Sequence, residues 1–168
     1  MQDEVERLVA VQAIQQVIYQ YCRAMDRIDH QLGYSVWHSD GIADYGAIFQ
    51  GTGVEFIDWV CEYHRKLQAQ FHRVSNITIN INGRKACSET YVKSTLYFVE
   101  GEENVLRTGH GRYLDTWSCR DGRWAIDVRS FVLDFVVTEV PKAVKLGSST
   151  RDVGDPSYAV LSEASDVR

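Results

Sequence analysis

The strand predicted near the C-terminal end of the chain carries an arginine among apolar residues. Its sequence, WAIDVRSFVLDF, spans residues 124–135. Alternate side chains of a strand face opposite ways, so Arg129 should share a face with apolar side chains, namely Phe131, Leu133 and Phe135. A guanidinium keeps its charge, and its burial is costly unless that charge is paired. Arg129 is therefore expected either at the mouth of a cavity or beside an anionic partner.

Asp26, Tyr21 and His72 are three further side chains that could take part in chemistry. Asp26 lies at the end of the first predicted helix, on the flank of its apolar stripe, where it could equally be a solvated acid. Tyr21 lies within that stripe and could be a core residue whose hydroxyl reaches a partner. His72 opens the first long strand, in FHRVSN. The odd-numbered residues there are the apolar set, which puts His72 on the opposite face unless a bulge intervenes.

Together these residue types indicate acid–base chemistry. An aspartate beside a histidine orients the imidazole and strengthens it as a general base. No serine or cysteine near His72 suggests a covalent nucleophile. The combination therefore favours proton abstraction over acyl transfer.

Hydrophobic periodicity predicts the elements that would position these residues. Residues 4–28 and 54–69 show helical spacing of apolar side chains. From residue 71 onward the period changes to two, and an Asp-Gly pair at 121–122 predicts a hairpin turn between the last two strands. Helices followed by an antiparallel meander predict an α+β domain, a curved antiparallel sheet packed on N-terminal helices around a cone-shaped pocket.

Composition limits the partners and the compartment. The chain has 168 residues and a net charge of -5, which argues against nucleic acid as a partner. It contains no apolar run as long as a membrane span, and its charged N-terminus does not resemble a signal peptide, so a cytoplasmic protein without membrane contact is expected. Metal-binding and phosphate-loop motifs are absent from the sequence, so no metal and no cofactor are predicted.

The chain divides into one domain and a tail. Residues 1–140 are expected to form the domain, and residues 141–168, which contain both prolines, a C-terminal tail that is loose or docked on a neighbouring subunit.

Several aromatic side chains could line an apolar substrate pocket or could be ordinary core. These candidates are Trp37, Tyr45, Phe49, Trp59 and Phe131. His110 lies between two glycines in TGHGR and could be a pocket residue or a residue at a bend. His30, His38 and His64 show no ligand spacing and are expected at the surface.

Three segments resemble the SnoaL-like branch of the nuclear transport factor 2-like superfamily. They are AIQQVIYQYCRAMDR, FHRVSN and RYLDTWSCRDGRWAIDVRS, and the resemblance covers residues 4–137. It is nearest to the group of hexachlorocyclohexane dehydrochlorinase and bile-acid 7α-dehydratase, with scytalone dehydratase further off. The resemblance implies a cone-shaped α+β barrel of the cystatin-like type.

The same resemblance implies a catalytic site. It places the family's Asp-His dyad on Asp26 and His72 and the family's last-strand arginine on Arg129. Five residues before the aspartate, the dehydrochlorinase carries a lysine and the bile-acid dehydratase a tyrosine. This chain has Tyr21 there, which favours loss of a hydroxyl group over loss of chloride.

The expected function is a cofactor-independent lyase, a dehydratase acting on a small hydrophobic cyclic or aromatic substrate. An isomerase or polyketide cyclase-like enzyme with the same dyad is an alternative. A non-catalytic scaffold, like the small subunits of ring-hydroxylating dioxygenases, is a third, although such a scaffold does not need the dyad together with Arg129. The resemblance also implies a homotrimer.

Overall fold

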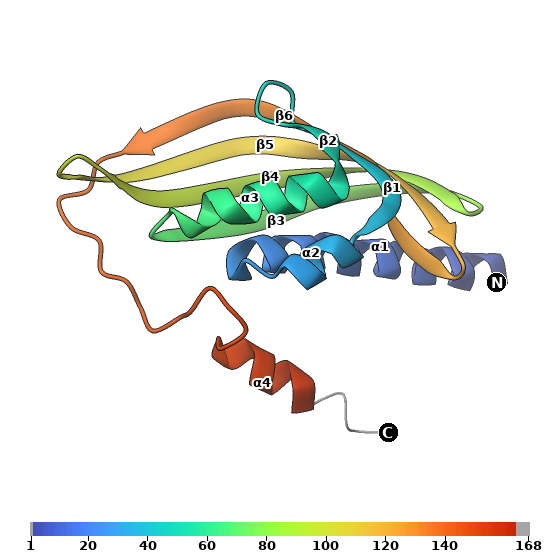
Figure 1. Ribbon diagram of the computed structural model, residues 1–168. Coiled ribbons are helices and arrows are strands. Elements are labelled where there is room, and N and C mark those ends of the chain that lie inside the picture. Colours follow the sequence, from blue (N-terminus) through green and yellow to red (C-terminus); the bar gives the residue numbers. More distant parts are fainter. Residues whose placement is uncertain (1, 164–168) are drawn as a thin grey trace.

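The computed structural model describes residues 2–163 as an α+β fold with helices on one side of a six-stranded sheet (Figure 1). The elements are, in chain order, α1 (Gln2–Arg27), α2 (His30–Ser35), β1 (Trp37–Asp44), β2 (Gln50–Thr52), α3 (Gly53–Arg65), β3 (Ala69–Asn82), β4 (Lys85–Glu100), β5 (Glu103–Arg120), β6 (Arg123–Glu139) and α4 (Pro156–Glu163). The predicted order of helices first and long strands second is confirmed.

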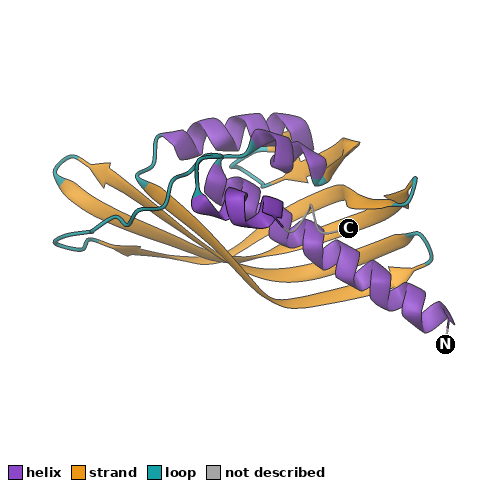
Figure 2. Cartoon of the chain, turned by 90° about the horizontal axis from the view of Figure 1, so that it is seen from below, coloured by secondary structure: helices purple, strands orange, loops and turns teal. Residues whose placement is uncertain are grey.

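The sheet is curved, mixed and open, with the strand order β2-β1-β6-β5-β4-β3. Strands β3 to β6 form the predicted antiparallel meander, but β1 pairs with β6 in parallel. The predicted cone-shaped α+β fold, with a curved sheet packed on N-terminal helices, is confirmed, and the sheet is unclosed, and it is mixed because of this one parallel pair. β1 and β6 are not consecutive strands, so no hairpin turn forces them to be antiparallel. Figure 2 shows the twisted, open sheet with the helices across one face.

Helix α3 begins at Gly53, and the hydrogen bonds of its first turn explain why it begins there. The Thr52 side chain accepts a hydrogen bond from the Glu55 amide, while the Glu55 carboxylate accepts one from the Thr52 amide. This reciprocal pair satisfies amide groups that the helix itself cannot bond. The apolar side of α3, with Phe56, Ile57 and Val60 buried, then faces the sheet.

The tail leaves the end of β6 and returns to the helical side of the same chain, where α4 lies beneath α1 and α2 (Figure 1). Arg23 of α1 donates a hydrogen bond to Ser157, and the Tyr158 hydroxyl donates one to Asp29. The sequence left a loose tail or one docked on a neighbouring subunit as the alternatives. The described part of the tail is instead docked on its own chain, because arginines of α1 and its own Ser and Asp residues are complementary.

None of the helices in residues 2–163 is long and apolar enough to cross a membrane.

Candidate active site

Asp26 and His72 form a hydrogen-bonded pair between α1 and β3. Nδ1 of His72 lies 2.8 Å from Oδ1 of Asp26, and the backbone N–H of His72 donates to both carboxylate oxygens, at 3.0 and 3.2 Å. Only 7% of the His72 side chain and 12% of the Asp26 side chain are exposed. A carboxylate accepts hydrogen bonds, so Nδ1 carries the ring proton and Nε2 of the neutral ring is the free base.

A bulge in β3 puts His72 on the inner face. Asn76 has a φ of +47°, and the register with β4 shifts between Ser75 and Thr78. Gln70 and His72 therefore face inward before the bulge, and the odd-numbered isoleucines, beginning with Ile77, face inward after it. Strict alternation across residues 71–82 would have placed His72 outside. Asn76 was the available signal, because asparagine is one of the few residues that tolerate a left-handed conformation.

His72 opens onto a cavity of about 390 Å³ between α1, α3 and the sheet. Its Nε2 lies 3.1 Å from the hydroxyl of Ser94 on β4, another lining residue. The lining residues are Tyr21, Met25, Tyr45, Ile48, Phe56, Trp59, Val60, Tyr63, His64, His72, Ser94, Leu96, Tyr113 and Phe131. The structure thus brings together five predicted site residues: His72, Tyr21, Tyr45, Trp59 and Phe131. None of the described residues lining the cavity is a lysine, arginine, aspartate or glutamate.

His64 is a member of this cavity that the sequence did not reveal. It was expected at the surface, but it is 3% exposed, and its Nδ1 lies 3.3 Å from the carbonyl oxygen of Met25. Its ring centre is 5.7 Å from that of His72. Burial, and then the neighbouring His72, lower the pKa of His64 to about 3, so this ring stays neutral near neutral pH. Helical spacing was the only signal, since His64 follows Val60 by four residues.

Two tyrosine hydroxyls meet at the cavity wall. The hydroxyl oxygens of Tyr21 and Tyr45 are 2.7 Å apart, and the Tyr21 ring contacts the Tyr113 ring edge to face. Burial raises the pKa of all three phenols well above the usual value of 10.0. They therefore remain protonated. One hydroxyl proton joins Tyr21 and Tyr45, and the other is not used in that bond.

Arg129 lies behind this wall, paired with an acid that the sequence analysis did not single out. Its Nε and Nη2 donate to the two oxygens of Asp115, at 2.7 and 2.8 Å, and both side chains are 0% exposed. The guanidinium also lies between the rings of Tyr21 and Tyr113, 4.2 and 4.1 Å from their centres. The expected anionic partner is thus present, and it belongs to the protein. Arg129 supports the tyrosines from behind and lies outside the cavity.

Three predicted substrate-binding residues also lie outside the cavity. Trp37 is 2% exposed and packs so closely on the start of α3 that a Cβ at Gly53 would come within 2.2 Å of its ring. Phe49 packs on Phe56 and Trp59 from the side. His110 faces the opposite side of the sheet, where it stacks on Phe135 at 4.4 Å.

Phe135 was expected on the same face as Arg129, but a register shift in β5–β6 after His110 moves it to the outer face.

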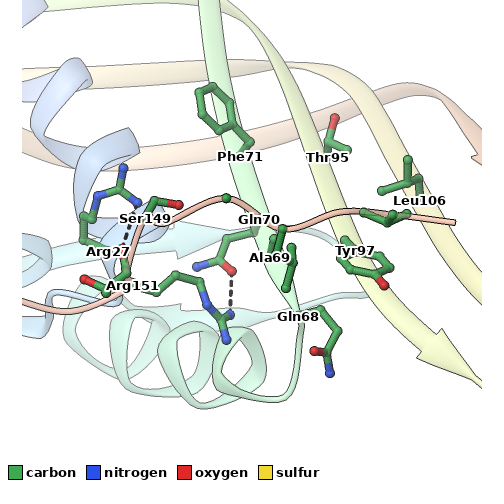
Figure 3. Close-up of a pocket in the computed structure, with 14 residues that line it drawn as sticks. Arg27, Gln68, Ala69, Gln70, Phe71, Thr95, Tyr97, Leu106, Ser149 and Arg151 are labelled. Carbon is green, nitrogen blue, oxygen red and sulfur yellow. Dashed lines mark hydrogen bonds between the residues drawn. The ribbon is translucent and has the colours of Figure 1, made fainter. Parts of the chain in front are cut away.

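A second cavity, of about 520 Å³, lies between the tail and the ends of β3, β4 and β5 (Figure 3). Although it is larger, it contains neither His72 nor the tyrosine pair, so the chemistry is assigned to the first cavity. Within residues 2–163, no three His, Cys, Asp or Glu side chains gather in a cluster that could hold a metal ion.

The fold and the position of the site define the class of protein. The family model described as SnoaL-like domain matches residues 6–130. This match spans well over half of the chain, and the chain therefore belongs to the SnoaL-like domain family. A comparison with curated protein sequences found no match.

Solved structures with the same fold include enzymes of elimination reactions. The chain is similar to the hexachlorocyclohexane dehydrochlorinase LinA-type3 from Novosphingobium barchaimii, with 17% identity, a TM-score of 0.72 and coverage of 86% of this chain and 98% of that one. It is also similar to a scytalone dehydratase candidate from Novosphingobium aromaticivorans, with 18% identity, a TM-score of 0.70 and coverage of 92% and 98%.

A third similar structure is a Mycobacterium tuberculosis protein of unknown function, with 19% identity, a TM-score of 0.67 and coverage of 94% and 87%. At these identities the likenesses establish the shared fold.

Proposed function

We propose that this protein is a lyase that removes a proton from carbon and expels a hydroxyl group, using its own side chains as acid and base. The observation that carries the proposal is the Asp26–His72 pair opening on an apolar cavity. The dehydrochlorinase and dehydratase named among the similar structures support an elimination. The family resemblance implies that Tyr21 takes the place of the dehydrochlorinase lysine, which favours water as the group lost.

In the first step Nε2 of His72 takes the proton from a carbon next to a carbonyl group. The Asp26 carboxylate holds the Nδ1–H and stabilises the imidazolium that forms. His64 remains neutral beside it, so no second positive charge opposes this proton transfer. A base positioned in this way contributes about 10²–10⁴ in rate.

In the second step the electron pair left on carbon forms the new double bond and the hydroxyl group leaves. One hydroxyl of the Tyr21–Tyr45 pair donates a hydrogen bond to the oxygen on which negative charge develops. Their raised pKa values keep them protonated as donors. The imidazolium donates the proton it removed to the departing hydroxide, so that water leaves and His72 returns to its starting state.

The cavity supports a proposal for the class of substrate. Aromatic rings such as Phe56, Trp59 and Phe131 make most of its wall, and none of its described lining residues is a lysine, arginine, aspartate or glutamate. A volume of about 390 Å³ suits one or two fused rings. We therefore expect an uncharged cyclic ketone with a hydroxyl group on the β carbon.

The proton abstraction can be tested without the natural substrate. The probe is α-tetralone in D₂O, and the measurement is exchange of its α-hydrogens followed by ¹H NMR. Wild-type protein should accelerate the exchange, and His72→Ala should lose about 10²-fold or more of that acceleration. The surface variant Lys145→Ala is the control. Equal rates for His72→Ala and wild type would overturn the proposal.

Elimination is then separated from isomerisation by product mass. With 3-hydroxy-1-tetralone as the probe, a dehydratase produces 1-naphthol with the loss of one water. With 3-cyclohexenone, an isomerase using the same dyad produces 2-cyclohexenone with no change of mass. Turnover of only the second probe would replace the lyase by the isomerase.

We also propose a homotrimer, as the resemblance implies. The sheet face away from the helices exposes large apolar side chains, among them Phe71 at 48% and Tyr91 at 43%. Association would cover them. A mass near 19.2 kDa by light scattering, which is that of one chain, would refute it.

A further inference from the structure

The side chain of Arg151 connects the tail to the end of α3 and the start of β3. Its Nη1 donates to the carbonyl oxygen of His64 and to Oε1 of Gln70, and its Nη2 donates to the carbonyl oxygen of Leu67, each at 2.8 Å. Figure 3 shows Arg151 extended toward Gln70, with the tail running beside the start of β3. Hydrogen bonds from a charged donor are the stronger kind, so this contact joins the end of α3, the following loop and β3.

Gln70 connects Arg151 to the Asp26–His72 dyad. It is 6% exposed, and its Nε2 donates to the carbonyl oxygens of Met25, at 3.0 Å, and Asp26, at 3.3 Å. Two residues further along β3 lies His72, whose backbone N–H and ring both bond the Asp26 carboxylate. A single amide therefore ties the backbone of the acid to the strand that carries the base, and Arg151 holds the other end of that amide.

The neighbouring tail residues repeat the attachment to α1. Arg27 follows Asp26 directly, and its Nη1 lies 3.4 Å from the Thr150 carbonyl oxygen, while its Nε lies 3.6 Å from Asp155. Asp155 is itself 6% exposed and accepts a hydrogen bond from the Thr150 amide. Asp26 and His72 do not contact residues 150–155 directly. Gln70 and Arg27, which lie next to them, make the contacts with these tail residues.

We propose that Arg151 is a positioning residue for the Asp26–His72 dyad, acting through Gln70, so that the docked tail is part of the active site. The inference rests on the proposed function for its kinetic consequence. Its structural consequence, a fixed distance between the Asp26 carboxylate and His72, does not depend on any substrate. Displacement of a catalytic group by about 1 Å can cost about 10²-fold in rate, so the effect should be large enough to measure.

The kinetic test compares Arg151→Ala, Arg151→Lys and the exposed tail control Lys145→Ala in the full chain. The readout is the rate of α-hydrogen exchange of α-tetralone at saturation and at low probe concentration. We expect Arg151→Ala to lower the saturated rate by about 10- to 100-fold with a smaller change in KM, because Arg151 does not itself line the cavity. Arg151→Lys should keep a higher saturated rate than Arg151→Ala. The control Lys145→Ala should keep the full wild-type rate.

The substrate-free test follows the backbone amide of His72 by ¹H–¹⁵N NMR and hydrogen exchange. This amide bonds the Asp26 carboxylate, so loss of alignment should shift its resonance and speed its exchange in Arg151→Ala. Gln70→Met should do the same, and the double variant should add little to either single variant, because both act on one chain of hydrogen bonds.

The outcomes separate this inference from the proposed function. An unchanged His72 amide in both Arg151→Ala and Gln70→Met would overturn the positioning role, even if His72→Ala abolishes exchange. A shifted amide together with full activity in His72→Ala would leave the positioning role standing and remove the proposed function. If Arg151→Ala does not fold, Arg151→Lys and Gln70→Met decide the question by the same two readouts.

Discussion

Replacement of Asp115 by asparagine should destabilise the protein far more than its small change in shape suggests. Asp115 and Arg129 are both 0% exposed, and two hydrogen bonds join the carboxylate to the guanidinium. Nη1 of Arg129 has no hydrogen-bond partner among the described residues. Asp115→Asn therefore leaves a buried cation that can neither lose its proton nor reach water.

The magnitude follows from this geometry. Breaking a buried ion pair by removal of one partner costs about 3–5 kcal/mol. The rings of Tyr21 and Tyr113 remain on the guanidinium, and such cation–π contacts are worth about 2 kcal/mol when desolvated. These ring contacts favour the lower end of the 3–5 kcal/mol range. We therefore expect the free energy of unfolding to fall by about 3 kcal/mol, equivalent to a fall in Tm of roughly 6–12 °C for a domain of this size.

The assay is urea unfolding followed by circular dichroism, with the double variant Asp115→Leu, Arg129→Met as the control. Because the double variant leaves no unpaired charge, it should lose less stability than Asp115→Asn. A loss below about 1 kcal/mol in Asp115→Asn would refute the argument, since it would mean that the tyrosine rings alone satisfy the charge. Retention of α-tetralone exchange by the double variant would show that Arg129 acts only through structure.

Three further predictions concern single side chains. Because burial holds the pKa of His64 at about 3 against 6.5 for an ordinary histidine, only the unfolded state takes up this proton between those two pH values, and stability should fall as pH falls through that window. Between pH 7 and pH 5, the free energy of unfolding measured in urea should fall by roughly 2 kcal/mol more in the wild type than in His64→Gln. Equal falls would contradict the assignment. Asn76→Val should lose about 1–2 kcal/mol by thermal unfolding, because a β-branched residue resists the φ of +47°, whereas an equal loss in Asn76→Gly would point to a lost contact instead. Thr52→Ala removes the helix cap of α3 and should cost about 1 kcal/mol in the same assay, with Thr52→Ser close to wild type.

The local features of the chain were predictable from the sequence. The helix over residues 4–28 was predicted from apolar spacing and is observed as α1, which covers Gln2–Arg27. The Asp-Gly turn was predicted because it requires left-handed backbone angles, and Asp121 and Gly122 have φ values of +51° and +78°. These features depend on neighbouring residues alone. Asp26 and His72 could be singled out because a family resemblance gave their pairing in advance.

Register was the part that the sequence did not determine. Counted from the turn at 121–122, Asp115 would face Val128, but an irregularity between Thr116 and Trp117 shifts the pairing by one, so that Asp115 faces Arg129. The bulge at Asn76 changes the inward-facing residues of β3 in the same way. A shift of one residue moves every later side chain to the other face, and packing across the whole sheet decides where that shift occurs.

The sequence by itself thus determined α1, α3, the meander of β3 to β6, the turn at 121–122 and the residue types available for acid–base chemistry, whereas it did not determine α2, β1, β2 or α4. The tertiary structure alone decided that His64 is buried beside His72, that Asp115 neutralises Arg129, and that Arg151 connects the tail to Gln70. The physical reason is separation along the chain. Arg151 and Gln70 are 81 residues apart, and only the closed fold brings their charges and hydrogen-bonding groups within reach of each other.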